Sequence, residues 1–174
     1  CHVRDGVVIG SRAAPGAPHV VAVSTELSSS EFCATCHQLT WPEADKPFYD
    51  TYGEWKASAY AEAGVRCQDC HMPPRAGPAT ATRFASVASH GFEADLARAL
   101  SIQVHLAGPD LRRGEPFTAT VKLQNTGAGH HVPTDSPFKM YRVSVDVVAP
   151  DGKPLAKPQV LDLGRIVEES PPWD

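Results

Sequence analysis

The pattern of apolar and polar residues changes along the chain, from no clear period to a helical one and then to strict alternation. In the final part every second residue is apolar from Leu100 to Leu106, from Phe117 to Gln124 and from Tyr141 to Val147. Such alternation predicts strands with one buried face, and a fourth strand is expected over 160–167. Strands at this spacing are typical of an antiparallel β-sandwich. Four strands are few for such a domain, so we expect this one to be incomplete.

A helical period governs the middle of the chain. Aromatic residues recur every three or four positions between Phe48 and Ala63, which predicts one long helix with an aromatic face. Gly64 is a suitable residue to end that helix. A shorter helix is expected to start at the serines of 28–30 and to run through 33–37. Residues 1–27 contain several glycines and prolines and show no period, so we expect loops there.

These elements indicate an α+β chain in two parts. Residues 1–97 are expected to form a loop-rich region with short helices, and residues 98–174 an immunoglobulin-like β-sandwich that is truncated. Sixteen prolines and thirteen glycines among 174 residues agree with many turns and little long regular structure.

The charge balance is mildly acidic. Sixteen lysines and arginines against twenty aspartates and glutamates give a formal charge of −4. A nucleic-acid partner is not expected, because phosphates require a basic face. No apolar run in the sequence is long enough to span a bilayer.

One spacing of cysteine and histidine occurs twice in the first half of the chain, at 33–37 and at 67–71. Cys-x-x-Cys-His is the attachment signature of a c-type haem. The two thiols bind the vinyl groups of the porphyrin, and the histidine becomes the proximal ligand of the iron. The opening residues 1–2 match the end of a third such motif, so we expect about three haem c groups, one with its first cysteine outside this chain. The predicted thioether cysteines are Cys1, Cys33, Cys36, Cys67 and Cys70, and the proximal histidines are His2, His37 and His71.

Other uses of these cysteines stay open. Two Cys-x-x-Cys pairs can hold a structural zinc ion through four thiolates. However, the roughly thirty residues between the pairs exceed the usual spacing, and zinc needs no histidine after each pair. A disulfide framework fits poorly with five cysteines, an odd number. Cys1 could instead be the lipid-modified first residue of a lipoprotein, a reading that the adjacent His2 disfavours. Because haem c is attached outside the cytoplasm and no signal peptide opens the chain, we expect the full protein to continue upstream.

A six-coordinate haem needs a second axial ligand on its other face. Met72 directly follows a proximal histidine and cannot reach the opposite face of the same haem. We therefore expect histidine on both faces, which gives a lower reduction potential than a histidine–methionine pair. His105 lies on the polar face of a predicted strand and is expected to be solvated. The distal candidates are His19, His90, His130 and His131, and only one of the adjacent last two is expected to bind.

Six stretches of the sequence, 1–6, 30–38, 54–55, 64–73, 89–92 and 125–134, are spread over most of the length of the chain. In them it resembles the periplasmic multihaem cytochromes c related to the cytochrome c554 type, in the subgroup with a β-sandwich after the haem region. The resemblance implies that His2 belongs to a complete haem site, that further sites lie upstream, and that His130 is the functional histidine of its pair. One departure is Asp135, where the family usually has glycine.

These observations favour electron transfer through several bis-histidine haems, and hence an electron carrier rather than an enzyme. The alternative is part of a multihaem reductase or oxidoreductase with one open catalytic haem. A zinc-binding structural module is the third reading. Redox proteins, other haem-bearing parts of the same protein and a membrane-associated complex are the expected partners. The expected location is the periplasm, the cell surface or the extracellular space of a bacterium.

Overall fold

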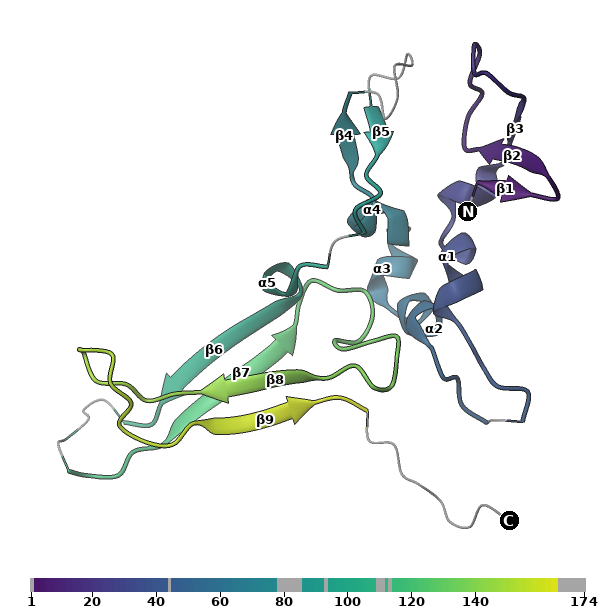
Figure 1. Ribbon diagram of the computed structural model, residues 1–174. Coiled ribbons are helices and arrows are strands. Elements are labelled where there is room, and N and C mark those ends of the chain that lie inside the picture. Colours follow the sequence, from purple (N-terminus) through teal and green to yellow (C-terminus); the bar gives the residue numbers. More distant parts are fainter. Residues whose placement is uncertain are drawn as a thin grey trace.

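The computed structural model describes residues 2–43, 45–77, 86–92, 94–108, 112 and 114–165. Short helices occupy the middle of the chain, and antiparallel strand pairs follow, extending to one side of the helices (Figure 1). The predicted α+β class is therefore confirmed. Cys1 and the last residues of the predicted fourth strand lie outside the described residues.

The prediction of loops over residues 1–27 is wrong, because a small sheet forms there. Strand β1 (Val3–Arg4) pairs antiparallel with β2 (Val7–Gly10), which pairs in parallel with β3 (Val21–Val23). Asp5 and Gly6, which join the first two strands, have φ angles of 51° and 76°. Two positive φ angles are what a type I′ hairpin turn requires, and Asp-Gly is a preferred pair for it. The 3-10 helix η1 (Thr25–Ser28) follows.

Two short helices carry the Cys-x-x-Cys-His motifs. Helix α1 (Ser30–His37) begins after Ser29, as the serines of 28–30 predict, and helix α4 (Cys67–His71) ends two residues before Pro73. Each motif therefore occupies one end or the whole of a helix.

The single long helix predicted over 48–63 is instead two helices, α2 (Thr51–Lys56) and α3 (Ala59–Glu62). Ser58 lies between them with an extended backbone, and its hydroxyl donates a hydrogen bond of 2.7 Å to the carbonyl of Trp55. Serine side chains compete in this way with the helical hydrogen bonds, which interrupts the helix. Tyr49 lies outside the helix because it forms a β-bridge with Leu39.

Gly64 ends α3 as predicted. Its φ is +74°, its amide donates to the carbonyl of Ala61, and the Val65 amide donates to the carbonyl of Tyr60. These two hydrogen bonds define a Schellman motif, in which the left-handed residue is usually glycine.

Replacing Gly64 by alanine is expected to lower the free energy of unfolding by about 1 kcal/mol, because an L residue is strained in the left-handed region. Nothing lies within 4 Å of the added methyl group, so no steric clash contributes. Gly164→Ala is the matched control, since its methyl would make only ordinary contacts and its φ is not positive. Urea unfolding of both variants measures the difference, and equal losses would contradict the strain argument.

The remaining elements are hairpins and one further helix. Strands β4 (Pro74–Ala76) and β5 (Ser86–Ala88) pair antiparallel, and helix α5 (Leu96–Ala99) leads into β6 (Leu100–Leu106). Strand β6 pairs with β7 (Ala119–Asn125), and β8 (Tyr141–Val145) pairs with β9 (Gln159–Leu163). All four strands predicted from the alternation are confirmed, with ends shifted by up to a few residues.

The expected buried face is missing from β6. Ile102 and Val104 are 63% and 61% exposed, because the pairs β6–β7 and β8–β9 form two separate two-stranded sheets. Among the described residues no hydrophobic residue is buried, and the one residue buried over its whole surface is Ser30. The sandwich arrangement therefore stays a prediction.

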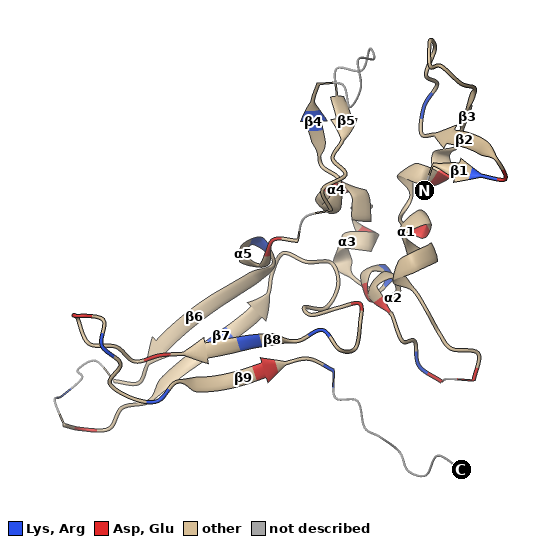
Figure 2. Ribbon diagram, viewed as in Figure 1, with Lys and Arg blue, Asp and Glu red and all other residues tan. Residues whose placement is uncertain are grey.

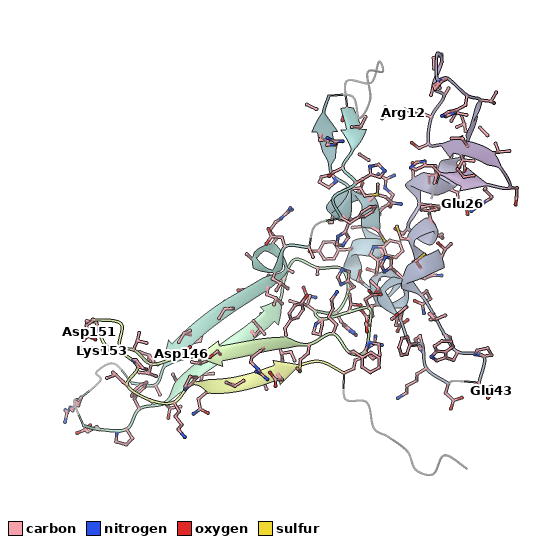
Figure 3. All side chains as sticks on the ribbon, in the orientation of Figure 1. Arg12, Glu26, Glu43, Asp146, Asp151 and Lys153 are labelled. Carbon is pink, nitrogen blue, oxygen red and sulfur yellow. The ribbon has the colours of Figure 1, made fainter. Side chains whose placement is uncertain are left out.

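Charged side chains of both signs are interspersed over the elements (Figure 2). Arg142 on β8 binds Asp162 on β9 through two hydrogen bonds of 2.8 and 3.0 Å. Lys153 and Asp151 pair at 2.8 Å beyond the end of β8 (Figure 3). In the described part of the chain, none of the helices has the length and apolar character that a membrane crossing requires.

Candidate functional site

Each motif helix presents its two thiols and its histidine together. In α1, Cys33, Cys36 and His37 stand at positions i, i+3 and i+4 of one helix. Residues at these spacings share one helix face. Helix α4 repeats the arrangement over 67–71. The four described cysteines form no disulfide, and each is partly or fully exposed. Both helices can therefore bring two thioether bonds and one axial nitrogen to the same side of a porphyrin.

The two motif helices are hydrogen-bonded to each other. The hydroxyl of Ser30, which is 2% exposed, accepts a hydrogen bond of 3.1 Å from the amide of Cys67. Gln68 donates a hydrogen bond of 2.6 Å to the carbonyl of Ser29. The neighbouring thiol of Cys33, together with the Ser30 hydroxyl, lowers the pKa of Cys67. The first cysteines of the two motifs thus face each other.

The start of α4 is held by Arg66 and Asp69. The Asp69 carboxylate accepts from the Arg66 amide at 2.8 Å and from its guanidinium at 2.6 Å. The guanidinium lowers the pKa of Asp69 through its hydrogen bond and its charge. Arg66 also donates a hydrogen bond of 3.0 Å to the carbonyl of Ser28, just before α1. This contact adds a second connection between the two motifs.

Two of the predicted proximal histidines each lie opposite a predicted distal one. The rings of His71 and His130 have centres 6.0 Å apart and planes inclined by 15°. The rings of His2 and His90 have centres 6.0 Å apart and planes inclined by 40°. Two metal–imidazole bonds of about 2 Å each, with about 1 Å from each ring centre to its nitrogen, separate the ring centres by about 6 Å. Both pairs therefore have the spacing of two imidazoles on opposite sides of one iron.

Three of these four rings have one nitrogen fixed by a backbone carbonyl. The Nδ1–H of His2 donates to Ile9 at 3.0 Å, that of His90 to Ala88 at 3.0 Å, and that of His130 to His131 at 2.8 Å. A hydrogen bond from Nδ1 selects the tautomer whose Nε2 carries a free lone pair, and metal-binding histidines are held in this way. The donor set therefore fits haem iron at both pairs.

The other candidate residues are placed differently. His37 directs Nδ1 to Asp135, with Oδ1 at 3.4 Å. His19 is exposed in the segment before β3. In the described part of the chain, neither ring lies against another histidine. His131 forms an ion pair of 3.0 Å with Glu54, and its ring is 79% exposed. The two neighbouring histidines thus differ in their contacts, since His130 lies against His71 and His131 contacts Glu54.

A family model for the N-terminal region of NapC/NirT cytochromes c matches residues 5–102, more than half of the chain. The chain belongs to the NapC/NirT cytochrome c family. It is therefore a multihaem c-type cytochrome that binds haem covalently and functions in electron transfer. No curated protein and no solved structure matches it. The narrower resemblance to the c554-related subgroup stays a prediction.

In this NapC/NirT cytochrome, glycines let the loop before His130 lie close to its neighbours. A methyl group on Gly127 would collide with the backbone oxygen of Arg98, and one on Gly129 would press on Tyr60 and Trp55. Two residues of the predicted aromatic face, Trp55 and Tyr60, thus lie against this loop. The side chain of Asn125 accepts a hydrogen bond from the Ala128 amide and donates one of 2.7 Å to the carbonyl of His130.

Glu54 anchors the same loop from α2. Its side chain is 4% exposed, and its carboxylate accepts from the His131 amide at 3.1 Å, from the Thr134 hydroxyl at 2.5 Å and from Arg165 at 3.1 Å. Burial opposes the charge of Glu54, but these hydrogen bonds and the cations outweigh it and lower its pKa. Glu54 therefore positions the segment that carries His130.

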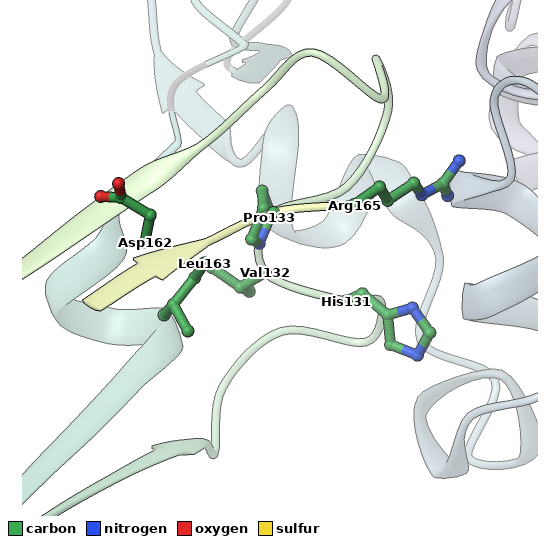
Figure 4. Close-up of a pocket in the computed structure, with 7 residues that line it drawn as sticks. His131, Val132, Pro133, Asp162, Leu163 and Arg165 are labelled. Atoms are coloured by element: carbon green, nitrogen blue, oxygen red, sulfur yellow. The ribbon is translucent and has the colours of Figure 1, made fainter. Parts of the chain in front are cut away.

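A cleft of about 340 Å³ lies between this loop and the end of β9. His131, Val132 and Pro133 line one side, and Arg165 follows the strand on the other (Figure 4). The basic side chains of His131 and Arg165 are both paired with Glu54.

Among the described residues, no three His, Cys, Asp or Glu side chains converge on one metal position. A four-thiolate zinc site needs all four thiols at one point.

Sequence reasoning missed the residues that support the histidines. Ser30 and Glu54 lie inside stretches that carry the family resemblance, but a single polar residue in a helix shows no sign of its burial. Arg165 reaches Glu54 from 111 positions along the chain, and no local pattern connects such residues.

Proposed function

We propose that this chain passes electrons between bis-histidine c-type haems. One haem is attached at Cys67 and Cys70 with His71 and His130 as axial ligands. A second is attached at Cys33 and Cys36 with His37 as proximal ligand. A third is attached through Cys1, with His2 and His90 as its axial ligands.

The observation that carries the proposal is the spacing of the two histidine pairs, each with ring centres 6.0 Å apart. A haem with both axial positions filled is closed to substrates, so it exchanges electrons only. For the second haem, His19 is the predicted distal ligand. His131 is not proposed as a ligand, because in the described part of the chain its ring contacts Glu54, whereas that of His130 lies opposite a proximal histidine.

The protein's setting is part of the proposal. Membership of the NapC/NirT family supports a periplasm-facing location, redox proteins as partners and a membrane-associated complex. We also propose the division into a haem region over 1–97 and a β-sandwich over 98–174, in which the second part supplies His130 to the first.

Optical spectra of the oxidised and reduced protein, with and without carbon monoxide, test the proposal together with a haem count. We expect low-spin bands, about three haems per chain and no response to carbon monoxide. A high-spin haem that binds carbon monoxide would instead show an open iron and favour a multihaem reductase. A chain without haem that binds zinc would overturn both.

A further inference from the structure

We propose that Asp135 lowers the reduction potential of the haem attached at Cys33 and Cys36, by accepting a hydrogen bond from its proximal ligand His37. The inference rests on the proposed function. It assigns to this haem a lower reduction potential than a neutral hydrogen-bond acceptor in place of the Asp135 carboxylate would give. Asp135 acts through His37 and is a positioning residue.

The contact differs in kind from those of His2, His90 and His130. His2, His90 and His130 donate from Nδ1 to neutral backbone carbonyls. His37 instead faces a carboxylate, with 3.4 Å between Nδ1 and the Asp135 Oδ1. This hydrogen bond is long, and its strength depends on the negative charge of the acceptor. Among these four rings, His37 alone has an acidic partner on Nδ1.

The backbone of Asp135 supports a specific role for its side chain. Its φ is 76°, in the left-handed region where glycine is the usual residue. An aspartate held there is strained relative to glycine, and such strain is most often found where a side chain has a function.

The surrounding loop fixes the carboxylate near His37. The adjacent Thr134 donates to buried Glu54 and lies 2.9 Å from the hydroxyl of Thr51. Asp135 is therefore attached to a segment that α2 holds in place. Its side chain is 34% exposed and that of His37 is 53% exposed, so both remain reachable by solvent and the effect is moderate.

The chemical consequence follows from the ligand. When a carboxylate accepts a hydrogen bond from Nδ1–H, the opposite ring nitrogen Nε2 donates more electron density to the metal. Stronger donation stabilises ferric over ferrous iron, and axial ligands with their hydrogen bonds are the protein's means of setting haem potentials. Asp135 therefore favours loss of the electron from this haem.

The test compares three variants by spectroelectrochemical titration of the haem-loaded protein. Asp135→Asn keeps the shape and removes the charge, and Asp135→Gly removes the side chain and relieves the strained φ. Asp162→Asn is the matched control, since it removes one negative charge from β9 beside Arg142. The variant with Cys33 and Cys36 both replaced by alanine identifies which titration wave belongs to this haem.

We expect both Asp135 variants to shift the reduction equilibrium of that wave toward ferrous iron by up to about tenfold, or about 59 mV for one electron. The control should shift it far less, and the ¹H NMR resonance of the His37 Nδ1–H should move in the Asp135 variants only. An unchanged wave in Asp135→Asn, or an equal shift in Asp162→Asn, overturns the inference. These outcomes leave the low-spin spectrum intact, whereas failure of the proposed function removes the haem or opens its iron.

Discussion

Replacing His130 by alanine is expected to open the iron of the haem attached at Cys67 and Cys70. The ring of His130 lies opposite that of His71 at the spacing of two axial ligands, so its removal leaves one coordination position free. One haem per chain should become high-spin and bind carbon monoxide, while the other haems stay closed. His130→Met should close the iron again and raise its potential, because a thioether ligand does so.

His131→Ala is the matched control for that experiment. Its ring binds Glu54 and not a histidine, so the spectrum should remain low-spin without carbon monoxide binding. If His131→Ala opened an iron and His130→Ala did not, the assignment of the two neighbours would be reversed.

Replacing Glu54 by alanine is expected to lower the free energy of unfolding by about 3 kcal/mol. The carboxylate is 4% exposed and binds Arg165 and His131, whose side chains are 34% and 79% exposed, so most of the loss comes from the broken hydrogen bonds and little from uncompensated charge. Because the His131 amide and Thr134 lose their acceptor too, the loop with His130 should loosen. Part of the protein should then bind carbon monoxide, which a purely global loss of stability would not produce in the folded fraction.

The acid dependence of stability provides a second measure of Glu54. Its pKa is below the ordinary value of 4.5 in the folded protein. A lowered pKa contributes stability that is fully present above the unfolded value and is lost as the pH falls through the folded value. Glu54→Gln keeps the size of the side chain, and its stability deficit should be largest near pH 7 and shrink below about pH 4.5. A deficit that is constant between pH 7 and pH 3 would show that the charge of Glu54 contributes nothing. Asp162→Asn is the control, since that carboxylate is also paired with an arginine but is far more exposed than Glu54.

Local patterns predicted the elements that depend on neighbouring residues. The helix through 33–37 begins at the serines of 28–30 and the four later strands follow the alternation, and both signals act within a few positions. Asp5-Gly6 was an equally local signal for a hairpin, and glycines and prolines elsewhere in 1–27 obscured it. The helix break at Ser58 depends on a side chain that bonds to Trp55, a choice that the aromatic period does not reveal.

The candidate site divides in the same way. The proposed thioether cysteines and proximal histidines follow from a five-residue spacing, but the proposed choice between His130 and His131 depends on Glu54, which is 77 positions from His131. The role assigned to Asp135 depends on His37, 98 positions away. Contacts of this length are set by how the loop packs on α2, which requires the folded chain.

The hydrogen bond between Ser30 and the backbone of Cys67 has a consequence for how fast electrons move inside the protein. It fixes the separation of the two attachment helices within the fold. Electron tunnelling weakens steeply with distance, so, with the haems attached as proposed, a fixed separation of these helices gives a constant rate of electron transfer between them. The overall rate of electron transfer through the proposed haems then depends on how long redox partner proteins stay bound, because the internal step does not vary.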